Sequence, residues 1–185
     1  MIYYDDNEIV IRAMTIDDID KIINGFKEQR WDKPRDVLEL YLTEQNNGEV
    51  YIFIAEFDNV VAGFTALYPT AKEGPFIDKN IPEISDFNVF TKYQRKGIGN
   101  KILEVAEKIA FDISTTKAIS LGVGLHSGYG AAQRIYSKRG YIPDGSGVWY
   151  KGKQFDLCNL TNAFCFYTLS SIICGTLYYA VLCDP

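Results

Sequence analysis

A basic turn with two glycines is the part of this sequence whose residue types and spacing most directly indicate chemistry. It runs from Val89 to Lys101, where an extended segment passes into a long helical pattern. Gly97 and Gly99 let an anionic ligand approach the backbone, and the free amide groups of a first helical turn point toward such a ligand. Positive charge is added by Arg95, Lys96 and Lys101. The pattern predicts a pyrophosphate-binding turn, although a solvated basic helix start would carry the same residues.

Two better-known phosphate motifs do not fit this turn. A Walker loop needs G-x-x-x-x-G-K followed by Ser or Thr, whereas Gly97 and Gly99 are separated by one residue and no Ser or Thr follows Lys101. A dinucleotide fingerprint needs a third glycine, and Ile102 stands at that position. The turn therefore indicates neither a nucleotide triphosphatase nor a dinucleotide-binding enzyme.

Side chains that could accept a proton lie on either side of the turn. Glu83 and Asp86 precede it on the same extended segment, and His126, the only histidine, follows the next strand. Each could act as a general base directly or through one water. A solvated strand-edge carboxylate and a loop histidine are the plain structural readings, so the base remains open. With one histidine and no cysteine near it, the sequence does not indicate a zinc site.

The elements that would position these residues mix strands with helices. Apolar spacings of three and four residues favour helices, β-branched and aromatic runs favour strands, and Asp58 and Asn59 tolerate the positive φ of a two-residue hairpin turn. The pattern predicts an α+β fold, an α/β sandwich in which helices flank a mixed central sheet. The expected order is strand 8–14, helix 16–26, helix 34–45, strands 51–57, 60–67 and 83–90, helix 96–113, strand 117–125, helix 130–138, and a strand from 141.

Length and charge limit the function classes further. The 185 residues carry 19 Lys plus Arg against 24 Asp plus Glu, a formal net charge of −5. An acidic chain does not suit nucleic-acid binding, which needs a basic face, and a cationic small substrate suits it better. The start of the chain shows no secretory signal, so we expect a cytoplasmic protein. Residues 1–156 are expected to form a single domain.

Two motifs in this order resemble the Gcn5-related N-acetyltransferase (GNAT) superfamily. The family's acetyl-coenzyme A motif is Q/R-x-x-G-x-G/A at a helix start, and residues 94–99 read Q-R-K-G-I-G. Residues 132–141 resemble its A-x-x-x-Y-x-K-x-G-F/Y segment, and the likeness covers roughly residues 8–150. Tyr129 departs from the pattern, since many members have there an Asn that contacts the cofactor arm.

The resemblance implies a GNAT-like acyl-CoA N-acyltransferase fold in which strands 83–90 and 117–125 splay apart. It implies an enzyme that moves acetyl from acetyl-CoA to a primary amine of a small molecule, or of a peptide N-terminus or lysine, by direct attack and without a metal. Tyr136 matches the tyrosine near the thioester sulfur, where a phenol could protonate the leaving thiolate. Glu83 lies fourteen residues before Gly97, as a catalytic glutamate does in some members. The residues implied for the cofactor are Val89, Phe90, Gln94, Arg95, Lys96, Gly97, Ile98, Gly99 and Asn100.

The alternative to catalysis is a coenzyme-A-binding module that has lost activity and serves as a sensor or interaction protein. On that reading the same turn would bind the cofactor, Glu83 would be a strand-edge carboxylate, and Tyr136 would be a packing residue.

The tail differs in composition from the rest of the chain. All four cysteines lie in residues 157–185, and the 27 residues between Asp156 and Asp184 carry no charge. Three interpretations stay open: closing strands of the sheet or a dimer contact, an altered end such as a frameshift would produce, and a membrane anchor. Polar residues lower the hydrophobicity of the tail, so the sequence does not favour a membrane anchor or a membrane partner. A homodimer through this tail remains an expectation.

Overall fold

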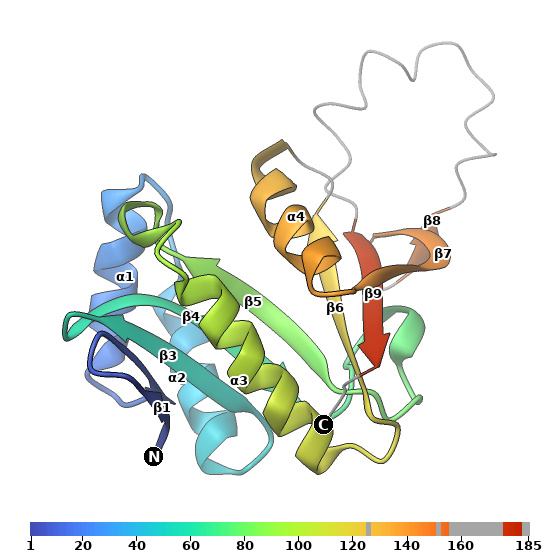
Figure 1. Cartoon of the computed structure of the whole chain (residues 1–185), viewed down its shortest axis with the longest axis horizontal. Coiled ribbons are helices and arrows are strands. Elements are labelled where there is room, and N and C mark those ends of the chain that lie inside the picture. Colours follow the sequence, from blue (N-terminus) through green and yellow to red (C-terminus); the bar gives the residue numbers. More distant parts are fainter. Residues whose placement is uncertain (125–126, 151–152, 156–175, 183–185) are drawn as a thin grey trace.

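The computed structural model describes residues 1–124, 127–150, 153–155 and 176–182, which form a mixed sheet with helices on both faces (Figure 1). The sheet order is β1-β2-β3-β4-β5-β6-β9-β7-β8. The strands are β1 Ile2–Asp5, β2 Ile9–Ala13, β3 Tyr51–Phe57, β4 Val60–Tyr68, β5 Glu83–Val89, β6 Ala118–Gly124, β7 Ile142–Tyr150, β8 Lys153–Phe155 and β9 Thr176–Leu182. The α-helices are α1 Asp18–Glu28, α2 Arg35–Asn46, α3 Ile98–Ile113 and α4 Gly130–Lys138. The predicted fold class, an α+β sandwich around a mixed sheet, is confirmed.

The β3–β4 hairpin and α3 lie close to where the sequence predicts them. Asp58 and Asn59 both have positive φ angles, 50° and 63°, as a tight hairpin turn requires. Other elements were not predicted, namely β1, which pairs antiparallel with β2, and β8, which pairs with β7. Ile16 was expected on the buried face of the first helix. It precedes α1 instead and is 64% exposed.

A buried ion pair explains why α1 begins at Asp18 and not earlier. The Asp18 carboxylate is fully buried and accepts two hydrogen bonds from the Arg12 guanidinium of β2, at 2.7 and 2.8 Å. The same carboxylate accepts hydrogen bonds from the amide and hydroxyl of Thr15 at 2.8 and 2.9 Å. Because these bonds satisfy the donors that precede the helix, they join the start of α1 to the sheet.

Each face of the sheet has its own hydrophobic core. Apolar side chains of α3 and α4 pack on one face against β2, β3, β5 and β6, and those of α1 and α2 pack on the other against β3 and β4. Figure 1 shows α3 crossing one face of the sheet, with α1 and α2 on the opposite side. We call these the α3 face and the α1/α2 face, because the candidate residues divide between them.

An extra residue in β5 changes which face its side chains reach. Ser85 pairs with Ala66 and Asn88 with Phe64, so three steps along β5 match two along β4. Asp86 has a φ of 52°, in the left-handed region. A β-bulge of this kind shifts side-chain alternation by one residue. As a result Phe87 lies on the same α3 face as Ile84, where regular alternation would place it on the other.

The two parallel strands β5 and β6 are paired over a short stretch only. The register contains Glu83 opposite Ser120 and Ile84 opposite Leu121. The divergence that the family resemblance implied is therefore present. Among the described residues, β5 from Ser85 onward is paired with β4 alone, and its other edge has no partner strand.

Part of the uncharged tail lies inside the sheet. Residues Thr176–Leu182 form β9, which pairs antiparallel with the whole of β6 on one side and with β7 on the other. Residues 156–175 and 183–185, with all four cysteines, lie outside the described residues. For these parts of the tail, the three interpretations stay predictions. Among the helices of the described chain, none combines the length and apolarity needed to cross a bilayer.

Removing β9 should therefore damage the sheet. We expect a chain truncated after Gln154 to be poorly soluble or to unfold without cooperativity, because β6 and β7 would both expose an unpaired edge. A chain truncated after Leu182 is the matched control and should behave as the full chain does. The measurement is solubility together with thermal unfolding followed by circular dichroism. A soluble 1–154 chain with one sharp transition would show that β9 is dispensable for the fold.

Candidate active site

The glycine turn after β5 has the backbone geometry of an anion site. Gly97 has a φ of 85° and precedes α3, and Arg95 before it has a φ of 64°. Among the described residues, no acceptor receives a hydrogen bond from the amide groups of residues 95–100, whereas the Lys101 amide bonds to the Gly97 carbonyl at 3.1 Å. Unpartnered amides at a helix start attract anions through their dipoles. The turn can therefore hold a phosphate group with its backbone alone.

The basic side chains of the turn differ in their contacts. Arg95 is exposed and has no ion pair within the described chain, and the Lys96 ammonium lies 4.2 Å from the ring centroid of Phe57. Lys101 instead forms an ion pair with Glu104 at 2.8 Å and lies over the Tyr4 ring. Its charge is thus already partly neutralised beside α3, so Arg95 and Lys96 are better placed to serve a bound anion.

The strand end before the turn is held by its own hydrogen bonds. The Gln94 side-chain amide donates to the Val89 carbonyl at 3.0 Å. Phe90 donates its amide to the Ala62 carbonyl at 2.9 Å and accepts from the Tyr93 amide at 2.8 Å. The Phe90 ring packs on the α1/α2 face, and Ile98 is buried, so neither side chain reaches the turn. That the cofactor contacts backbone groups of Val89, Phe90, Ile98 and Asn100 stays a prediction.

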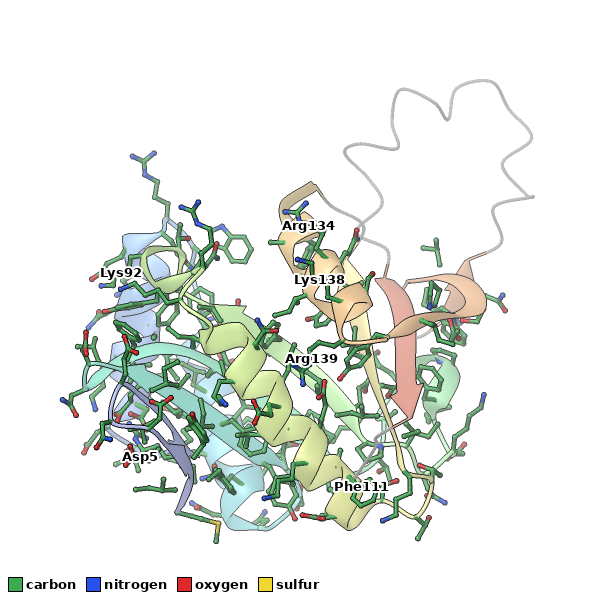
Figure 2. All side chains as sticks on the ribbon, viewed as in Figure 1. Asp5, Lys92, Phe111, Arg134, Lys138 and Arg139 are labelled. Atoms are coloured by element: carbon green, nitrogen blue, oxygen red, sulfur yellow. The ribbon has the colours of Figure 1, made fainter. Side chains whose placement is uncertain are left out.

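Helix α4 lies beside the first turn of α3 and brings two further cations. A Cβ atom at Gly99 would lie 3.3 Å from the Phe87 ring and 3.5 Å from Ile135 of α4. Arg134 and Lys138 are one helical turn apart and therefore share a face of α4. In the view of Figure 2 both lie along the edge of α4 nearer the start of α3. This pair is not among the residues predicted for the cofactor, although the i, i+4 spacing of two basic residues is visible in the sequence.

Tyr136 of α4 lies on the α3 face, beside Phe87 of β5. Its ring is buried, with its centroid 5.9 Å from the ring of Phe87 and 5.7 Å from that of Tyr141. Burial raises the pKa of its hydroxyl above the ordinary value, and the nearby Tyr129 raises it further. A phenol with a raised pKa keeps its proton at neutral pH, so Tyr136 is available as a proton donor.

Glu83 lies on the opposite, α1/α2 face of the sheet. It pairs with Tyr68 across β4 and β5, and directly opposed residues of an antiparallel pair share a face. Its side chain is 7% exposed and has no ion pair within the described chain. Burial raises its pKa to about 7, the Glu73 carboxylate adds to the rise, and the Lys72 backbone amide opposes it. A carboxyl group with this pKa can both take up and release protons at neutral pH.

The two carboxylates that were candidates for the base have different partners. Asp86 forms an ion pair with Lys33, accepts a hydrogen bond from the Tyr41 hydroxyl at 3.2 Å and another from the Asn88 amide at 2.8 Å. Glu83 has no such set. Asp86 is therefore held by an ion pair and two hydrogen bonds, whereas Glu83 is buried without an ion pair among the described residues. The third candidate, His126, lies outside the described residues. Within those residues no group of three or more metal-ligating side chains is placed to hold an ion.

Comparison with known proteins identifies the family. The sequence profile described as Acetyltransferase (GNAT) family matches residues 16–141. The chain therefore belongs to this family and is an acetyltransferase. No curated protein matches the chain by sequence.

Solved structures agree with this fold. An N-acetyltransferase from Staphylococcus aureus Mu50 is 16% identical with a TM-score of 0.66, covering 96% of this chain and 100% of its own. YncA from Salmonella typhimurium, solved with its cofactor acetyl-CoA, is 16% identical with a TM-score of 0.64 and coverage of 96% and 95%. The Salmonella typhimurium acetyltransferase that modifies the N-terminal serine of ribosomal protein L7/L12 is 9% identical, with a TM-score of 0.70 and full coverage of both chains.

The raised pKa of Glu83 predicts a pH dependence of stability that can be measured without any substrate. Because the folded-state pKa is about 7 against 4.5 for the free group, the native state binds this proton more tightly than the unfolded state does. The stabilising contribution of the protonated carboxyl is complete below about pH 4.5 and is lost as the pH rises through 7. We expect Glu83→Gln, which cannot ionise, to gain stability relative to the natural chain between pH 5 and pH 8, in thermal unfolding. Parallel unfolding curves for the two proteins across this range would contradict the assignment.

Proposed function

We propose that this acetyltransferase moves the acetyl group of acetyl-CoA to the primary amine of a small cationic molecule, by direct attack of the amine. The observation that carries the proposal is the placement of a proton donor and a proton acceptor on opposite faces of β5, beside the gap between β5 and β6. Tyr136 lies on the α3 face together with the phosphate turn, and Glu83 lies on the α1/α2 face.

The turn and the free edge of β5 fit acetyl-CoA as the co-substrate, which supplies an acyl group on a thioester. The free amides of residues 95–100 suit its pyrophosphate, with Arg95 and Lys96 beside them. Arg134 and Lys138 of α4 add positive charge on the neighbouring edge, where a further phosphate could be neutralised. The unpaired edge of β5 after Ile84 offers backbone groups to the extended arm. That YncA was solved with acetyl-CoA supports the same co-substrate here.

The amine would approach from the α1/α2 face. Carboxylates line that face, with Glu83 and Asp86 on β5 and Glu44 on α2. Because Lys33 and Lys72 already neutralise Asp86 and Glu44, Glu83 is the group left to attract an ammonium. Glu83 takes the proton of the ammonium, directly or through one water, because it is the carboxylate without an ion-pair partner. Tyr136 gives its proton to the sulfur as the carbon–sulfur bond breaks. One neighbour modifies a protein N-terminal serine, so a peptide amine is the second acceptor to test.

Two glycines with the same backbone strain provide a test of the phosphate turn. Gly97 and Gly147 both have a φ of 85° and open space around the missing Cβ, so replacing either with Ala should cost about 1 to 2 kcal/mol of stability. Only Gly97→Ala should also weaken acetyl-CoA binding, because it distorts the amides of the turn. The measurement is isothermal titration calorimetry, with thermal unfolding as the control. Equal cofactor affinity in the two variants would remove the turn from the binding site.

Loss of the Tyr136 hydroxyl should slow transfer without weakening cofactor binding. A general acid acts only as charge develops on the leaving sulfur, so we expect Tyr136→Phe to lower kcat by roughly 10² to 10⁴ with acetyl-CoA affinity nearly unchanged. Phe keeps the ring contacts with Phe87 and Tyr141. The measurement is release of free thiol from acetyl-CoA in the presence of a panel of amines. If no amine stimulates thiol release by the well-folded natural chain, an inactive coenzyme-A-binding module becomes the better description.

A further inference from the structure

A lysine of this chain already lies on the face proposed for the acceptor amine. Lys33 belongs to the connection between α1 and α2, where its neighbours Asp32 and Pro34 are exposed. Its own side chain is only 15% exposed and its ammonium group forms an ion pair with Asp86 in the bulge of β5. Among the described lysines, no other forms an ion pair with a residue of β5.

Aromatic rings complete the surroundings of this ammonium group. The Lys33 nitrogen lies 5.7 Å from the ring centroid of Phe64 and 5.8 Å from those of Phe26 and Tyr41. Rings at this distance attract a cation through their negative faces. Because burying an ammonium group is costly without compensation, the carboxylate and the three rings together explain why this lysine points inward. They also form a site suited to a primary alkylammonium group.

The position of Asp86 relates this site to the reacting groups. Asp86 is followed by Phe87, whose ring contacts Tyr136 on the α3 face, and neighbouring residues of a strand are about 3.3 Å apart. Both residues lie on the part of β5 that has no partner on the β6 side among the described residues, and their side chains reach opposite faces of the strand. An acetyl group held along that edge would therefore face Tyr136 from the α3 face and Lys33 from the α1/α2 face.

We propose that Lys33 is a site of self-acetylation, at which the chain transfers acetyl from acetyl-CoA to its own amine. This inference rests on the proposed function. The Lys33 ammonium gives up one proton to solvent as it leaves the ion pair with Asp86, and the free amine attacks the carbonyl carbon. The carbon–nitrogen bond forms, the carbon–sulfur bond breaks, and the sulfur leaves with the electron pair and takes a proton from Tyr136. The nitrogen loses its second proton to solvent, from which Tyr136 is reprotonated, leaving N-acetyl-Lys33 and free coenzyme A.

Lys92 provides a control within the same molecule. It too forms an ion pair with a carboxylate, Glu28 at 2.6 Å, and lies over an aromatic ring, Tyr93 at 5.1 Å. It is 52% exposed, so unassisted chemical acetylation should favour it over Lys33. If Lys33 is acetylated faster than Lys92, the groups around Lys33 must accelerate the reaction.

The experiment incubates the full chain with acetyl-CoA without added amine and follows each lysine by peptide mass spectrometry. We expect Lys33 to be acetylated faster than Lys92, at a rate independent of protein concentration, as a reaction within one chain requires. Tyr136→Phe should slow acetylation of Lys33 by roughly 10² to 10⁴ and leave that of Lys92 unchanged. Lys33→Arg, which keeps the charge, should gain one acetyl group fewer in intact mass.

The possible failures can be told apart. Acetylation that follows exposure, with Lys92 ahead of Lys33, would overturn the proposal, as would a rate that rises with protein concentration. Thiol release with an added amine while Lys33 stays unmodified would overturn this inference alone and leave the proposed function standing. No thiol release with any amine and no modification of Lys33 would overturn both.

Discussion

The structure depends on one extra residue in β5. Asp86 adopts a positive φ of 52°, which costs energy for a residue with a side chain. Its carboxylate is held by Lys33, Tyr41 and Asn88, and these bonds offset that strain. Since the bulge shifts the alternation of β5, Phe87 lies on the α3 face next to Tyr136, and Asp86 lies on the α1/α2 face. One local irregularity in a strand thus sets which residues of β5 reach each face beside the proposed reacting groups.

Opposite faces of the same strand can serve different chemical roles because the sheet is open beside it. In the described part of the chain β5 pairs with β6 at two positions, whereas β9 pairs with the whole of β6 along its other edge. The α3 face carries the glycine turn and a buried phenol whose pKa is raised. The α1/α2 face carries a buried carboxyl whose pKa is raised to about 7 and an ion-paired carboxylate. Burial raises the pKa of both Tyr136 and Glu83. The shift suits a phenol proposed to donate a proton on one face and a carboxyl proposed to accept one near neutral pH on the other.

Local patterns predicted those elements that depend on neighbouring residues. The Asp58-Asn59 hairpin and the glycine turn before α3 were found because each depends on a backbone conformation that few residue types adopt readily. The first helix was predicted to begin at residue 16, two residues before α1 does, since the observed start also depends on Arg12 reaching the Asp18 carboxylate from another element. Strand β9 was not assigned, because it pairs with β7 and, more than fifty residues earlier in the chain, with β6. Pairing between strands so far apart in the chain cannot be predicted from a short stretch of sequence.

The sequence by itself determined the family motifs, the phosphate turn and the candidate proton-transfer residues, because glycine conformation, charge and residue type are properties of single positions. Residue type did not distinguish Glu83 from Asp86, and only the spacing of Glu83 from the glycine turn favoured it. The tertiary structure distinguishes their surroundings, by placing Lys33 and Tyr41 beside Asp86 across 53 and 45 residues of chain and by burying Glu83 without an ion pair among the described residues. The physical reason is that the protonation of a carboxyl group depends on the solvent and charges that surround it, and those are supplied by elements distant in sequence.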